Sequence, residues 1–64
     1  MRVNGKEIEI GNGITLREFL VASGYDLERI AVELNGNISP RKTYGDVVLD
    51  DSDSIEIVCF VGGG

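Results

Sequence analysis

The residues of this chain with the clearest chemical potential are the last six, Cys59-Phe60-Val61-Gly62-Gly63-Gly64, where an apolar segment runs into three glycines. Glycine loses more backbone entropy on ordering than any other residue and adds no side chain to a core, so these glycines do not serve stability. They are therefore either a loose terminal segment without a function or the substrate of another enzyme. As a substrate, an unbranched tail of about 10 Å, at roughly 3.3–3.6 Å per residue, would thread a narrow slot and present the Gly64 carboxylate to another enzyme.

The side chains offer few means of catalysis. The sequence contains no histidine, which excludes Ser-His and Cys-His pairs and a histidine-ligated zinc ion. Its carboxylates are scattered over a domain too small to enclose a cleft that perturbs them. Residues 50–53 carry three aspartates but lack the loop length and the glycine of a calcium site, so we interpret them as a solvated turn. We therefore expect no enzyme, no bound cofactor and no metal.

Cys59 allows two interpretations. A thiol within a strand is most often a small buried hydrophobic side chain, and we expect that here. The alternative is a sulfur relay, because Cys59 lies five residues before Gly64. Reaction of the native protein with a thiol reagent would separate them.

Length and composition indicate one small domain. The chain has 64 residues, 42% of them apolar, and a single cysteine, which suggests a reducing compartment. Neither a signal peptide nor an apolar run of roughly 20 residues is present, so we expect a cytoplasmic protein without membrane contact. Eleven acidic and six basic side chains give a net charge of −5, which opposes nucleic-acid binding and favours a partner with a basic face. Solubility alone would also explain this charge.

The first half of the chain predicts a hairpin followed by a helix. In residues 1–10, Asn4-Gly5 suits a tight turn, and alternation directs Ile8 and Ile10 inward with Glu7 and Glu9 in water. Gly11-Asn12-Gly13 then breaks the strand. Thr15 and Glu18 form a capping box for a helix that starts at Leu16 and ends near Gly24, with one apolar stripe formed by Leu16, Phe19 and Leu20.

The second half predicts a strand pair, an irregular crossing and a final strand. Residues 25–29 fit a loop or a single turn and lead into a strand at 30–34. Asn35-Gly36 then makes a tight turn to a short strand at 37–39. Pro40 opens a turn of helix at 41–43, and residues 44–49 cross the domain with Val47, Val48 and Leu49 available to the core. Residues 54–61 form the strand with the strongest β preference.

The final strand has two distinct faces. Ile55 and Ile57 share one face, while Glu56, Val58 and Phe60 share the other. An outward face should be polar, so Val58 and Phe60 indicate a contact patch beside the tail, unless a bulge or the irregular crossing covers them. The predicted fold is α+β: a mixed sheet of four to five strands curled round one main helix in residues 1–61, followed by a flexible glycine tail at 62–64.

Several segments together match a known pattern along nearly the whole chain. They are Val32-Glu33-Leu34-Asn35-Gly36-Asn37-Ile38-Ser39-Pro40-Arg41, Val48-Leu49 before an acidic turn, and Ile55-Glu56-Ile57-Val58-Cys59-Phe60-Val61-Gly62-Gly63-Gly64. On these residues the chain resembles the ThiS-type sulfur carriers of thiamine biosynthesis, which have the ubiquitin-like β-grasp fold. It departs from their pattern at Tyr44, where tryptophan is expected, at Asp51-Ser52-Asp53, and at Cys59, a position that is often polar.

The resemblance implies a function for the tail. A ThiF-type adenylating enzyme would use Mg-ATP to convert the Gly64 carboxylate to an acyl adenylate, and sulfur from a donor such as a cysteine desulfurase would displace AMP to form a thiocarboxylate. A ThiG-type thiazole synthase would then receive the sulfur. Gly62 and Gly63 would thread the active sites, with Val58 and Phe60 as the nearest docking surface. The alternatives are a molybdopterin-synthase small subunit, a ubiquitin-like protein modifier, and a non-catalytic β-grasp interaction module.

Overall fold

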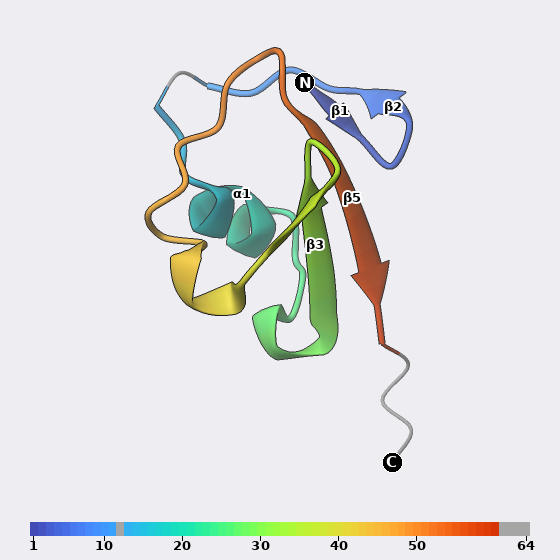
Figure 1. The fold of residues 1–64 in the computed structure, drawn as a ribbon. Coiled ribbons are helices and arrows are strands. Elements are labelled where there is room, and N and C mark those ends of the chain that lie inside the picture. Colours follow the sequence, from blue (N-terminus) through green and yellow to red (C-terminus); the bar gives the residue numbers. More distant parts are fainter. Residues whose placement is uncertain (12, 61–64) are drawn as a thin grey trace.

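The computed structural model describes residues 1–11 and 13–60, and within them five strands form one mixed sheet in the order β2-β1-β5-β3-β4 (Figure 1). The elements are β1 (Arg2–Val3), β2 (Lys6–Glu7), α1 (Leu16–Ala22), the 3-10 turn η1 (Leu27–Arg29), β3 (Ile30–Leu34), β4 (Asn37–Ser39), the 3-10 turn η2 (Arg41–Thr43) and β5 (Ser54–Cys59). The central strand β5 runs parallel to β1 and antiparallel to β3. Among the described residues, no helix combines the length and apolar content that a membrane crossing requires.

The predicted N-terminal hairpin is confirmed, although its strands are shorter than expected. Asn4 and Gly5 have φ angles of 50° and 84°, as a primed turn requires, and Arg2 pairs with Glu7. The second strand ends at Glu7, but the Ile8 N–H still donates to the Met1 carbonyl at 2.8 Å before the chain runs on towards α1. Ile8 is still half-buried against the core, so the predicted alternation holds beyond the strand itself.

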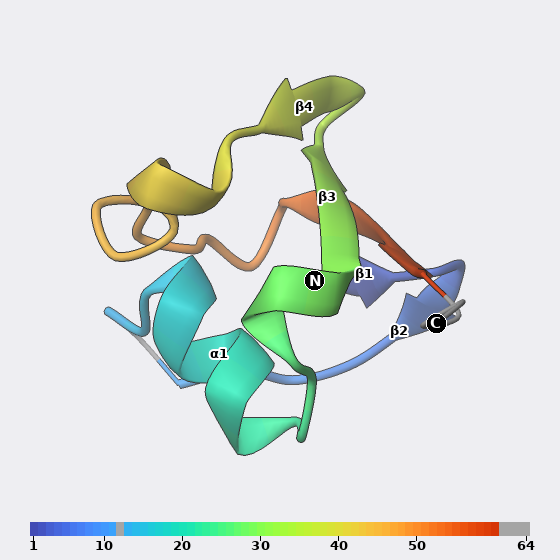
Figure 2. The same ribbon diagram turned by 90° about the horizontal axis from the view of Figure 1, so that it is seen from below.

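Helix α1 begins and ends where the local signals predict. The Thr15 backbone N–H donates to Glu18 Oε1 at 2.9 Å, and the Glu18 N–H donates to Thr15 Oγ1 at 3.1 Å, which completes the capping box. After the C-cap, Gly24 adopts a φ of 86° that favours glycine. Figure 2 shows α1 on one side of the sheet, where Leu16 and Leu20 are fully buried.

The strands β3 and β4 have the predicted bounds. Asn35 and Gly36 have φ angles of 52° and 86°, so this second Asn-Gly turn also has left-handed backbone. Its asparagine side chain reaches the start of the last strand: the Ser54 N–H donates to Asn35 Oδ1 at 2.9 Å, and Asn35 Nδ2 donates to Asp53 Oδ1 at the same distance. The turn therefore fixes where β5 begins.

The crossing at residues 44–49 corrects one prediction. Tyr44 and Leu49 are buried, but the Val48 side chain is 61% exposed rather than available to the core. The Leu16 N–H donates to the Val47 carbonyl and the Leu49 N–H to the Ile14 carbonyl, so this segment runs as an extended chain beside the start of α1. Neighbouring side chains in an extended segment point to opposite sides, and Val48 therefore faces outward between two inward neighbours.

The capping box of α1 yields a prediction for stability. Thr15→Ala should lower the free energy of unfolding by about 1 kcal/mol at pH 7, because the Glu18 N–H loses its acceptor. The hydrogen bond from the Thr15 backbone N–H holds the pKa of Glu18 below its ordinary value of 4.5. A lowered folded-state pKa contributes stability above the ordinary pKa that is lost as the pH falls through the folded value.

Glu18→Gln is the matched control, because glutamine keeps an acceptor for the Thr15 N–H but does not titrate. Wild type should be more stable than Glu18→Gln at pH 7, and the difference should shrink as the pH falls below the ordinary carboxyl pKa. Urea unfolding followed by circular dichroism at several pH values measures this difference. If the difference in free energy of unfolding between wild type and Glu18→Gln stayed constant down to acid pH, ionised Glu18 would not be what stabilises the start of α1.

Candidate functional site

The candidate site lies at the carboxyl end of β5. Phe60, the last described residue, donates its backbone N–H to the Arg29 carbonyl at 2.7 Å, so pairing with the chain before β3 extends to this point. Val61, the predicted last residue of the strand, lies outside the described residues. So do Gly62, Gly63 and Gly64, and the predicted function and flexibility of this tail stay predictions.

The contact patch predicted beside the tail is exposed. Val58 and Phe60 have 56% and 54% of their surface accessible, whereas Ile55 and Ile57, which alternate with them along β5, are buried beneath α1. The alternative prediction, that a bulge or the irregular crossing covers these two residues, is therefore wrong. Large apolar side chains left in water beside one another mark a contact site in a small soluble domain.

The sheet register adds residues that we did not predict. Val58 pairs with Ala31, Glu56 pairs with Glu33, and Glu33 pairs in turn with Ile38 on β4. We call the part of this side formed by β3, β4 and residues 56–60 the outer face; it lies opposite α1 and consists of Ala31, Glu33, Ile38, Glu56, Val58 and Phe60. Alternation within each strand indicates which side chains point outward, but which of them become neighbours depends on pairing across strands.

Cys59 is exposed, so the expected buried position is wrong. The alternation of β5 directs it to the same side as Ile57, but Figure 1 shows the carboxyl end of the strand reaching beyond α1. In addition, β1 pairs with β5 only at Ser54 and Ile55. The inner side of the strand therefore loses its cover before Cys59.

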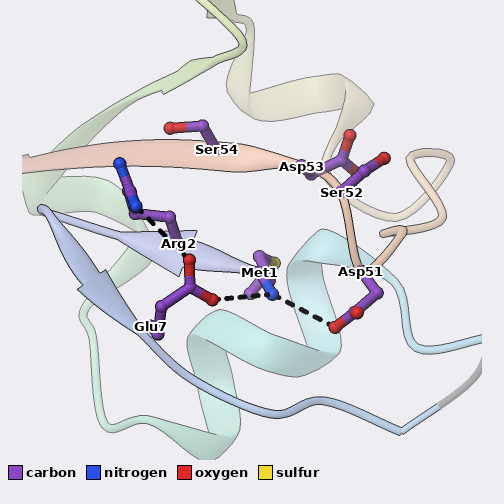
Figure 3. Close-up of a pocket in the computed structure, with 7 residues that line it drawn as sticks. All are labelled: Met1, Arg2, Glu7, Asp51, Ser52, Asp53 and Ser54. Atoms are coloured by element: carbon purple, nitrogen blue, oxygen red, sulfur yellow. Dashed lines mark hydrogen bonds and ion pairs between the residues drawn. The ribbon is translucent and has the colours of Figure 1, made fainter.

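A hollow at the opposite end of β5 is lined by charged groups that hold two parts of the fold together. Figure 3 shows that its charged groups point towards one another: the Met1 ammonium donates to Asp51 Oδ1 at 3.1 Å and lies 3.8 Å from a Glu7 oxygen, while Arg2 lies 3.5 Å from the other Glu7 oxygen. These contacts join the N-terminal hairpin to the turn before β5. The hollow lies at the far end of the strand from the candidate site.

The acidic turn at residues 50–53 also uses its carboxylates internally. Asp50 accepts from the Ser52 hydroxyl and backbone N–H, which lowers the pKa of Asp50, and Asp53 accepts from the Asp50 N–H at 2.8 Å. This is the solvated turn that the sequence predicts. Across residues 1–11 and 13–60, no group of three or more Asp, Glu, Cys or His side chains is placed to hold a metal ion.

Known proteins resemble this chain over its full length. The model of the ThiS family matches residues 1–64. The sulfur carrier protein ThiS of Bacillus subtilis is 41% identical over 66 residues, covering 100% of this chain and 98% of that protein. A thiazole synthase of Magnetococcus marinus is 42% identical over 64 residues, covering all of this chain but 20% of the enzyme. The chain thus spans about a fifth of the length of that relative.

The fold comparison agrees with the sequence comparison. The crystal structure of the thiamine biosynthesis protein ThiS from Geobacter metallireducens superposes with a TM-score of 0.77 at 30% identity, covering 98% of this chain and 96% of the other. The two structures share the ubiquitin-like β-grasp fold, with a mixed sheet and one main helix as described above. From these matches in sequence and structure, the chain belongs to the ThiS family of sulfur carriers in thiamine biosynthesis.

Proposed function

We propose that this protein carries sulfur as a thiocarboxylate on Gly64 and delivers it for formation of the thiazole ring of thiamine. The observation that carries the proposal is the match of the whole chain to a sulfur-carrier family, combined with three glycines that follow the apolar residues Phe60 and Val61 in the sequence. The proposed reaction uses the main-chain carboxylate of Gly64 rather than a catalytic side chain, which suits a sequence without histidine.

The proposed chemistry divides one difficult substitution into two steps. A carboxylate is a poor acyl electrophile because its charge is delocalised and oxide is a poor leaving group. A ThiF-type adenylating enzyme would join the Gly64 carboxylate to the α-phosphate of Mg-ATP and release pyrophosphate. A sulfur nucleophile would then attack the acyl carbon and release AMP. Hydrosulfide gives the thiocarboxylate directly. A persulfide from a donor such as a cysteine desulfurase gives an acyl disulfide, which a second thiol must reduce, forming a disulfide itself, to free the thiocarboxylate. Both ATP and magnesium belong to the partner enzyme in this scheme.

The role of this chain is to be recognised and to position the tail. Residues 61–64 span at most about 14 Å beyond Phe60, at roughly 3.3–3.6 Å per residue. An enzyme that acts on Gly64 must therefore approach the end of β5 closely. Val58 and Phe60, the exposed apolar residues there, are suited to contact it.

The acceptor of the sulfur would be a ThiG-type thiazole synthase. The Magnetococcus marinus relative supports this partner, because a segment similar to the whole of the present chain forms part of a thiazole synthase there. Two domains that act on each other in one polypeptide in one organism commonly act as separate partners in another.

The proposal predicts a defined mass change. After incubation with ATP, a sulfide source and a ThiF-type adenylating enzyme, the intact protein should gain the mass difference between sulfur and oxygen, mapped to Gly64. The gain should be absent without ATP and absent in a variant that lacks Gly64. An unchanged mass, with an enzyme that loads a known carrier, would exclude the proposed chemistry.

A second prediction concerns the apolar residues beside the tail. Phe60→Ala combined with Val58→Ala should raise the KM for loading by the adenylating enzyme about tenfold or more, because truncating the few central anchors of an interface costs about 1 kcal/mol or more each. Val21→Ala is the matched control, since Val21 is 57% exposed on α1, away from the outer face. If the double variant and the control had equal KM values, the adenylating enzyme would dock on other residues of this protein.

A third prediction concerns Cys59. The thiol is exposed and should react quickly with a thiol reagent in the native protein. Because we place the transferred sulfur on Gly64, Cys59→Ser should still gain the same mass at the wild-type rate. Loss of loading in this variant would instead support a relay through the thiol.

A further inference from the structure

The outer face contains two carboxylates placed side by side. Glu33 on β3 and Glu56 on β5 are direct partners in the antiparallel register, and both are exposed. Directly opposed residues have Cβ atoms about 4.5–5.5 Å apart, and like charges in such positions destabilise a sheet. In the described part of the chain the ion pairs use other carboxylates, those of Glu7, Asp26 and Asp51. Arg2, on the same side of the neighbouring strand β1, lies beside Ser54 and forms its ion pair with Glu7. Within residues 1–11 and 13–60, the two opposed carboxylates thus have no ion pair of their own.

Exposed apolar side chains surround this acidic pair. Ile38 pairs with Glu33 from the other side and is 70% exposed, and Val58 and Phe60 follow Glu56 on the same face of β5. Three of the five large apolar side chains that are exposed among the described residues thus lie on the outer face. A protein that covers this apolar surface must also cover the two carboxylates.

Covering two carboxylates without a cation is very costly, because each loses its hydration in a medium of low dielectric constant. A partner must therefore supply positive charge between Glu33 and Glu56. Arginine fits best, since its planar guanidinium presents several N–H donors and stays charged when desolvated. A second copy of this chain is a poor occupant, because it would bring the same two carboxylates and a net charge of −5.

We propose that the outer face is the docking surface for the thiazole synthase, and that an arginine of that enzyme, set in an apolar surface, binds between Glu33 and Glu56. This inference rests on the proposed function and adds the chemistry of the partner's surface to it. The like-charge pair then destabilises the free carrier and stabilises the complex. A merely structural role of either glutamate would not produce opposite effects on these two properties.

The test compares E33Q, E56Q and the double variant with wild type. Each single variant should raise the melting temperature by about 2–4 °C, because it removes the repulsion. The double variant should bind a ThiG-type thiazole synthase at least about tenfold more weakly in a calorimetric titration, and its affinity should depend less on salt concentration. Glu9→Gln is the matched control, because Glu9 is exposed outside the outer face; it should leave the affinity unchanged.

Loading of each variant with sulfur on Gly64 is measured in parallel, by intact mass, at saturating adenylating enzyme. If wild type is loaded but the double variant binds thiazole synthase as wild type does, the docking inference is wrong and the carrier function stands. If the double variant bound the adenylating enzyme more weakly but bound thiazole synthase as wild type does, the inference would also be overturned, since the two glutamates would then serve the adenylating enzyme instead. Failure of wild type to load would refute the carrier function itself, whatever the binding data show.

Discussion

The structure depends on the position of β5 in the middle of the sheet. Its start pairs with β1 on one side, and its residues from Ile55 to Cys59 pair with β3 on the other. The two Asn-Gly turns hold it from both flanks, because Asn35 Oδ1 accepts from the Ser54 N–H and Asn4 Oδ1 accepts from the Ile57 N–H at 2.7 Å. Both asparagines adopt a positive φ, so the residues that make the turns also fix the central strand.

This arrangement gives the two faces of one strand different tasks. Ile55 and Ile57 lie beneath α1 and complete the core, while Glu56 and Val58 point to the outer face. In a domain of 64 residues, few strands are available, and the strand that leads to the tail is also the central strand of the sheet. Because β5 is paired within the sheet, the short reach of residues 61–64 limits where Gly64 can be placed relative to any surface that binds the outer face.

In the proposed chemistry the reactive group belongs to the main chain. The protein then needs no catalytic side chain, and its sequence is free to serve stability and recognition. The composition of the outer face fits that division, because exposed apolar residues and an unrelieved acidic pair do not stabilise the free domain. The partner enzymes would supply ATP, magnesium and the sulfur donor.

The sequence by itself determined the features that arise from neighbouring residues. The capping box, both Asn-Gly turns, the bounds of β3 and β4 and the turn after Pro40 were all predictable, because short-range hydrogen bonds and φ preferences decide them. The exposure of Val58 and Phe60 followed from alternation along one strand.

Only the tertiary structure decided that Glu33 lies opposite Glu56, that Cys59 is exposed and that Val48 points to water. Each depends on the pairing of segments far apart in the sequence or on how far α1 covers the sheet, and these long-range contacts leave no signal in the local sequence.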